Sequence, residues 1–170
     1  MRIDDAEARV LTTWSEFLVA IAGASSALTG LVFVALSINL ARIIELPGVS
    51  GRAAETLIVL AGALIGSLAA LMPNLTQQQL GAALLAVALP TWALPLLIQI
   101  RAVFARTYHR VSLIALRAGL HQVATLPGVA AGLSLCGAFG GGMAWFALGA
   151  ILSLLVAMFG AWVLLVEILR

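Results

Sequence analysis

Lysine is absent from this chain, and charged residues of any kind are scarce. All nine basic residues are arginine, and only 9% of the 170 residues are charged, against roughly a quarter in an ordinary soluble domain. Hydrophobic residues make up 63% of the chain, and the mean hydropathy is +1.15. So little polar surface excludes a soluble globular protein and predicts an integral membrane protein that contacts the lipid bilayer. Because the arginines flank apolar runs, they do not form the basic surface that nucleic acid requires.

Motifs of enzymes and metal sites are also absent. A single cysteine, Cys136, stands in an apolar run, which excludes a disulfide within the chain and predicts a small packing residue. The sequence contains no HExxH, no GxSxG with partner residues and no CxxC. We therefore expect a protein that is not an enzyme and that holds no metal and no cofactor.

Five apolar runs are each long enough to cross a bilayer, which takes about 20 residues. Backbone groups in lipid must be paired, so each run is predicted to be a helix. Pro73-Asn74 closes the second run, and the glycines at 140–142 separate the last two. The prediction is an all-α, polytopic transmembrane helical bundle in a single domain, residues 1–170, with spans at about 17–40, 53–72, 80–100, 118–139 and 143–168.

The arginines lie unevenly about these spans. Seven lie on one side, in the connection 40–53, the arginine-rich loop 101–117 and the C-terminus, and two lie on the other side, near the N-terminus. Because arginine-rich connections stay in the cytoplasm, the N-terminus is predicted outside and the C-terminus in the cytoplasm.

The first span carries its polar residues on one stripe. At 100° per residue, Ser25, Thr29 and Asn39 fall within a sector about 80° wide. This stripe either packs against other helices or lines a water-filled space, and both alternatives stay open at this point. The opposite stripe, called the bare stripe below, has no polar atom and consists of Ala27, Leu31, Val34 and Ile38.

Small residues recur at helical spacing in four of the five spans. Examples are Gly62 and Gly66 in the second span and Gly128 and Gly132 in the fourth. Because lipid supplies no hydrophobic drive between helices, close contact depends on such residues. We expect a tight bundle that keeps surface free for a homo-oligomer.

Four polar residues near the span ends are candidates for a role in function. Glu16 lies on the side of the bare stripe, so a symmetric pore lined by that face would have a ring of Glu16 at its mouth. Glu55 is expected to pair with Arg52 at a helix start, and Gln99 to make an interhelical hydrogen bond. His121 is either an interfacial histidine or a proton-responsive group.

Three segments, GASSALTGLVFVALSINLARI, LPGVSGRAAETLIVL and AWVLLVEILR, resemble a family of small bacterial membrane proteins of unknown function. Some members of that family are labelled modulator of FtsH protease. The resemblance covers nearly the whole chain and implies a location in the bacterial plasma (inner) membrane. It also implies a membrane protease as a partner.

A second, local resemblance concerns SSALTGLVFVALSINL in the first span and LMPN at the end of the second. Both are similar to segments of Orai calcium channels. The resemblance implies that Ser25 and Thr29 match a serine ridge that packs against neighbouring helices, and that the bare stripe matches the pore-facing line. Ile38 stands where Orai has its selectivity glutamate, so calcium selectivity is not implied.

The leading expectation for function is a homo-oligomeric, channel-like assembly that conducts cations. Its pore would be lined by the first span, through Glu16, Ala27, Leu31, Val34 and Ile38. The alternative is an accessory membrane protein that does not conduct and that modulates a membrane protease or another partner. A third interpretation is a proton-coupled carrier that uses His121.

Overall fold

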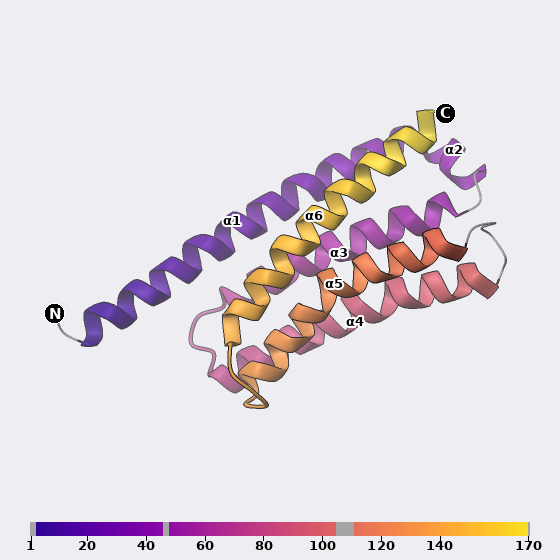
Figure 1. Cartoon of the computed structure of the whole chain (residues 1–170). Coiled ribbons are helices and arrows are strands. Elements are labelled where there is room, and N and C mark those ends of the chain that lie inside the picture. Colours follow the sequence, from indigo (N-terminus) through magenta and orange to yellow (C-terminus); the bar gives the residue numbers. More distant parts are fainter. Residues whose placement is uncertain (1–2, 46–47, 105–110, 170) are drawn as a thin grey trace.

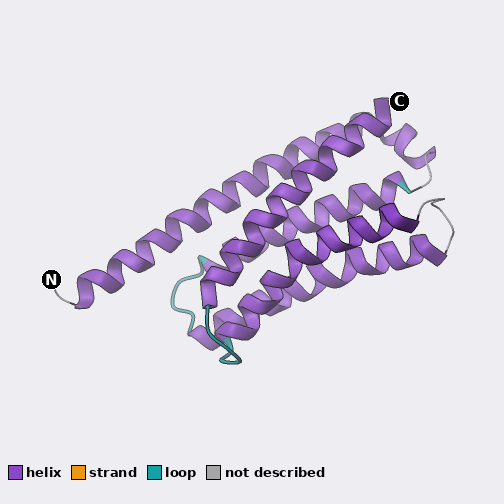
Figure 2. Cartoon of the chain, in the orientation of Figure 1, coloured by secondary structure: helices purple, strands orange, loops and turns teal. Residues whose placement is uncertain are grey.

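The computed structural model describes residues 3–45, 48–104 and 111–169, and every regular element in them is a helix (Figure 1, Figure 2). The predicted all-α class is confirmed. In chain order the helices are α1 (Ile3–Ile38), α2 (Leu40–Glu45), α3 (Val49–Ala70), α4 (Gln77–Phe104), α5 (Val111–Leu135) and α6 (Gly142–Leu169).

Helices α1, α4 and α6 run in one direction and α3 and α5 run in the other, and α3 lies centrally among them (Figure 1). It packs against α1, α4 and α6, while α5 packs between α4 and α6. In contrast, α1 lies at one edge, and its first turns project beyond the ends of the other helices. One side of α1 therefore faces the bundle and the other side faces outward.

Four of the described helices are long and apolar enough to cross a membrane. Their segments are Trp14–Ile38, Val49–Ala70, Gln77–Phe104 and Gly142–Leu164, which overlap the predicted first, second, third and fifth spans. The predicted fourth span corresponds to α5, a 25-residue helix with several polar residues in its first half. Because α5 packs between α4 and α6, these residues have protein neighbours, as polar groups in a membrane bundle require. The helices fit a multi-pass membrane protein.

The arginine-rich segment 101–117 is helical at both ends, where a loop was predicted. Helix α4 continues to Phe104 and α5 begins at Val111, and residues 105–110 lie outside the described residues. The segment contains neither proline nor glycine, so nothing in its sequence stops a helix. Apolar residues in its second half continue the helical pattern into α5.

The two ends of the bundle differ in charge. One end, called the arginine end below, gathers α2, the starts of α3 and α5 and the ends of α4 and α6 (Figure 1). It carries Arg42, Arg52, Arg101 and Arg117. The opposite end holds the turns 71–76 and 136–141, which contain no charged residue. The fold thus brings to one end four of the arginines that the sequence assigns to one side of the membrane.

Side chains hold both turns at this opposite end, called the uncharged end below because neither turn carries a charged residue. Thr76 and Gln79 form a capping box at the start of α4, with each backbone nitrogen donating to the other side chain, at 2.9 and 3.3 Å. Ser134 Oγ donates to Phe139 O and accepts from Gly142 N, both at 2.8 Å. Gly142 has a φ of 42°, which other residues rarely adopt. The glycine run therefore separates α5 from α6, as predicted.

Small residues let α4, α5 and α6 approach closely. A Cβ added at Gly149 of α6 would lie 2.9 Å from the backbone nitrogen of Gly128 in α5. One added at Gly132 would lie 3.0 Å from the carbonyl oxygen of Gly81 in α4. The predicted role of small residues in helix packing is confirmed at these crossings. Cys136 is exposed overall, but its Sγ lies against Gly81, so it also packs on α4.

Candidate functional site

The polar stripe of α1 faces the bundle. Ser25 is fully buried, and Thr29 Oγ1 donates to the Ser25 carbonyl oxygen at 2.6 Å. Asn39 Nδ2 donates to the Ala35 carbonyl oxygen at 2.9 Å, and both Thr29 and Asn39 are half-buried. Thr29 and Asn39 thus donate to backbone carbonyls one turn earlier, which lets them pack against apolar neighbours. Ser25 Oγ is buried without a hydrogen-bond partner among the described residues. Of the two alternatives for the stripe, the structure favours packing.

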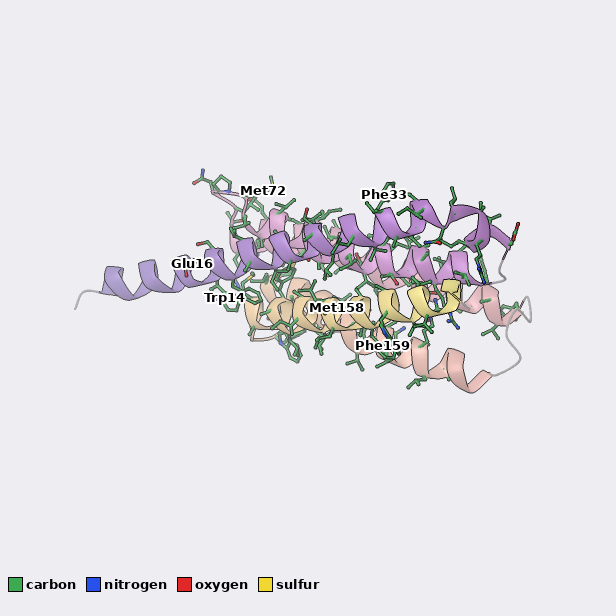
Figure 3. The ribbon with its side chains drawn as sticks, turned by 90° about the horizontal axis from the view of Figure 1, so that it is seen from above. Trp14, Glu16, Phe33, Met72, Met158 and Phe159 are labelled. Atoms are coloured by element: carbon green, nitrogen blue, oxygen red, sulfur yellow. The ribbon has the colours of Figure 1, made fainter. Side chains whose placement is uncertain are left out.

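The bare stripe faces away from the bundle. Leu31, Val34 and Ile38 are 68%, 57% and 78% exposed, and Ala27 and Glu16 are exposed as well. Figure 3 shows the neighbouring Phe33 pointing away from the other helices. The residues predicted to line a pore therefore form one outward face of the chain, with Glu16 toward the uncharged end of the bundle.

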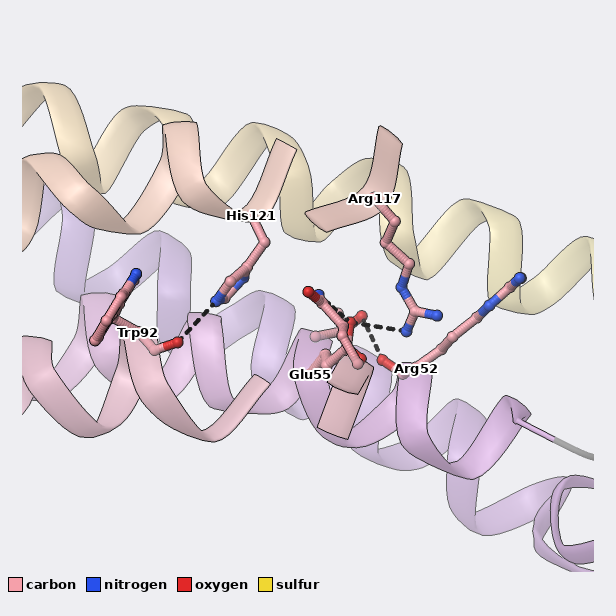
Figure 4. A network of polar contacts seen from close by, with 7 residues as sticks. Arg52, Glu55, Trp92, Arg117 and His121 are labelled. Carbon is pink, nitrogen blue, oxygen red and sulfur yellow. Dashed lines mark hydrogen bonds and ion pairs between the residues drawn. The ribbon is translucent and has the colours of Figure 1, made fainter. Parts of the chain in front are cut away.

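A buried ion pair joins three helices near the arginine end. Arg117 Nη2 of α5 lies 2.8 Å from Glu55 Oε2 of α3, and Gln99 Nε2 of α4 donates to the same oxygen at 3.2 Å (Figure 4). Glu55 and Gln99 are 7% and 3% exposed. Arg52, one turn before Glu55 on α3, attracts the same carboxylate. The predicted interhelical bond of Gln99 is confirmed, and Glu55 gains a partner, Arg117, that the sequence did not suggest.

His121 lies beside this network and is 3% exposed. Its Nε2 lies 3.4 Å from the carbonyl oxygen of Trp92 on α4 (Figure 4). The next residue, Gln122, accepts a hydrogen bond from Trp92 Nε1 at 2.6 Å through its Oε1. Trp92 therefore ties α4 to α5 through two successive residues. The burial of His121 and its contact with Trp92 fit a histidine that is hydrogen-bonded to a neighbour. A proton-responsive role for His121 stays a prediction.

A cleft of about 390 Å³ opens beside the ion pair, between α3, α5 and α6. Its polar lining consists of Arg52, Glu55, Thr56, Arg117 and His121. Its apolar lining consists of Val59, Leu116, Leu120, Val156, Ala157, Phe159, Gly160 and Val163. The volume falls within the range of roughly 300–1,000 Å³ that is typical of ligand sites. Sequence reasoning missed this cleft because its walls come from three helices far apart in the chain.

Metal chemistry finds no support in the described ranges 3–45, 48–104 and 111–169. No three His, Cys, Asp or Glu side chains in them lie close enough together to hold a metal ion. The ion pair and the bond from Gln99 join α3, α4 and α5, and the cleft has room for a ligand.

No family model, curated protein or solved structure matches the chain. The two family resemblances therefore stay expectations, and the argument for function rests on the geometry of α1 and of the cleft.

Proposed function

We propose that the chain is an integral membrane protein that forms a homo-oligomeric, channel-like assembly with α1 nearest the symmetry axis. The observation that supports this proposal is the orientation of α1. Its polar stripe packs inward, and its bare stripe faces outward along most of the membrane-spanning length. An outward face with this composition is available to a second copy of the same helix.

Small residues on the same face favour close approach of another helix. Gly23, Ala27 and Gly30 are all exposed, and a Cβ added at either glycine would meet no atom within 4 Å. By contrast, the glycines at the α4, α5 and α6 crossings are already in contact within the protomer. In lipid, helices associate where small residues allow backbones to approach.

In such an assembly, the side chains of one face would repeat around the axis. Leu31, Val34 and Ile38 would form an apolar constriction of the kind that gates by dewetting. Glu16 would form an acidic ring toward the uncharged end and attract cations. Conduction of cations is the activity that this arrangement would support.

A non-conducting accessory role is the second candidate. The outward face carries no charged side chain from Val19 to Ile38, so it also suits a helix of another membrane protein, such as a membrane protease. In that role the chain would bind its partner through α1 and conduct nothing.

Disulfide crosslinking of single cysteines tests the channel proposal. In a Cys136→Ala background, Leu31→Cys, Val34→Cys and Ile38→Cys should each crosslink two copies in membranes. Ser25→Cys should not, because Ser25 is fully buried in the protomer. Leu155→Cys on α6 is the matched control, because Leu155 is 57% exposed and lies on another surface.

The outcome separates the two candidates. Crosslinking on α1 alone would place α1 at an axis, and conductance that changes in Val34→Ser would then support a pore. Equal crosslinking at Leu155→Cys, or none at the three α1 positions, would overturn the α1-centred oligomer. A partner that copurifies with the wild type and is lost in Gly30→Leu would then favour the accessory role.

A further inference from the structure

We propose that a small cavity inside the bundle, between α3, α4, α5 and α6, binds internal water. This central cavity is lined by the hydroxyl-bearing residues Thr91, Thr125 and Ser153, and the water would donate hydrogen bonds to their oxygens. The proposal does not rest on the channel proposal, because α1 contributes no residue to the cavity.

The central cavity lies where four helices meet. Its wall includes Ala63 of α3, Leu84 of α4, Ala124 of α5 and Ala150 of α6, and all four side chains are buried. The cavity has a volume of about 40 Å³, and a single water needs roughly 10–15 Å³. It shares no lining residue with the cleft beside the ion pair. The bundle therefore has room for water at a place separate from that cleft.

The three hydroxyl groups come from three different helices. Thr91 belongs to α4, Thr125 to α5 and Ser153 to α6. Thr125 and Ser153 are buried, and Thr91 Oγ1 lies where a Cβ added at Gly62 of α3 would be. Cavities that stay dry have apolar walls, whereas buried polar groups are typically joined by water. The convergence of three hydroxyl groups on one small cavity thus favours water.

The protons of these hydroxyl groups are already used. Each donates to a backbone carbonyl oxygen, namely Thr91 to Val87, Thr125 to His121 and Ser153 to Ala124, at 2.7, 2.8 and 3.2 Å. A hydroxyl group has one proton and two lone pairs, so each oxygen can still accept a hydrogen bond. The cavity therefore offers acceptors to a small donor. Water fits, because it carries two protons and is small enough for the volume.

Solid-state NMR of the full chain in lipid bilayers tests the proposal. The experiment measures the transfer of magnetisation from water to individual side chains. Thr125 and Ser153 should receive it, although both are buried. Ala131 is the matched control, because it lies on α5 like Thr125, is fully buried and does not line the cavity. Its methyl group should receive no magnetisation at the same mixing time.

A pair of glycine variants tests the location of the water. A Cβ added at Gly128, which lines the cavity, would lie 3.7 Å from Cβ of Ala88 on the α4 side, an ordinary contact. Gly128→Ala should therefore take up the space of the water and abolish the transfer to Ser153. Gly119→Ala adds the same methyl group to α5 in open space and should leave the transfer unchanged. Circular dichroism would verify that each variant keeps its helices.

A pair of threonine variants gives a second measurement, the stability of the chain in mixed micelles. Thr29 and Thr125 both donate to the carbonyl oxygen one turn earlier, but Thr29 lies outside the cavity. Thr125→Val should raise the equilibrium constant of unfolding about fivefold more than Thr29→Val, because it also removes an acceptor of the water.

Three results would overturn the proposal. The first is the absence of magnetisation transfer to Thr125 and Ser153, or equal transfer to Ala131. The second is unchanged transfer in Gly128→Ala, which would place the water elsewhere. The third is an equal effect of Thr125→Val and Thr29→Val on unfolding, which would indicate a dry cavity.

Discussion

Glu55 is the residue whose environment differs most from that of a typical membrane-flanking acid. Its carboxylate is buried, paired with Arg117 and hydrogen-bonded by Gln99. A buried charge that loses its partner is strongly destabilising, because the remaining charge has neither water nor a counter-ion. The two partners differ in their exposure, since the side chain of Arg117 is partly exposed and that of Glu55 is buried.

This difference predicts unequal effects of the two single substitutions. Arg117→Gln should lower the free energy of unfolding by about 3–5 kcal/mol, because it leaves Glu55 buried without its ion-pair partner. Glu55→Gln should cost less, because Arg117 can turn toward the headgroup region. The measurement is reversible unfolding in mixed micelles.

The double variant Glu55→Gln/Arg117→Gln provides the control for that experiment. It removes both charges, so it should recover part of the stability lost in Arg117→Gln. Additive losses in the double variant would contradict the idea that the two side chains stabilise each other.

At the scale of elements, the spacing between helices depends on glycines at the crossings. Gly149 of α6 lies against α5, where an added Cβ would lie 2.9 Å from the backbone nitrogen of Gly128 and 3.3 Å from Cβ of Pro127. Gly119 of α5 has open space around it, with no atom within 4 Å of an added Cβ. Gly149 is therefore in close contact with a neighbouring helix, whereas Gly119 has room for a side chain.

Substitution by alanine should separate these two cases. Gly149→Ala should lower the free energy of unfolding by about 1–3 kcal/mol, because α5 and α6 must move apart. Gly119→Ala should raise it by about 0.4–1 kcal/mol, because alanine loses less backbone entropy on forming a helix. Unfolding in mixed micelles compares them directly, and equal losses would contradict the close crossing of α5 and α6.

At the scale of the whole molecule, the two ends of the bundle define an orientation in the membrane. Arg42, Arg52, Arg101 and Arg117 lie at one end, and the two turns at the other end carry no charge. We propose that the arginine end faces the cytoplasm of a bacterial inner membrane, following the positive-inside rule. The N-terminus of α1 would then lie outside.

Labelling with a membrane-impermeant maleimide tests this orientation. In a Cys136→Ala background, Gln78→Cys at the uncharged end should be labelled in intact spheroplasts. Glu45→Cys at the arginine end should react only after the membrane is opened. Both positions are exposed, so a difference between them reports the side of the membrane. The reverse pattern would contradict the proposed orientation.

Much of the architecture follows from local sequence. Apolar runs in lipid must pair their backbone groups internally, so each run becomes a helix whatever its neighbours are. Helix ends are also local, because Pro73-Asn74 and the glycines at 140–142 interrupt the helical backbone directly. The inward and outward stripes of α1 follow from helical periodicity within 15 residues of chain.

Other features depended on how the helices pack. Glu55, Gln99 and Arg117 lie on three different helices, and they meet only because each helix has a particular rotation and axial shift relative to the others. That rotation is decided by many side-chain contacts acting together, including the glycine crossings. The same packing separates α6 from α5 near the arginine end and leaves the cleft between them. The sequence by itself therefore determined a helical membrane protein with an apolar outer face on α1. The tertiary structure alone decided which distant polar residues meet, because contacts between helices are not encoded within any single segment.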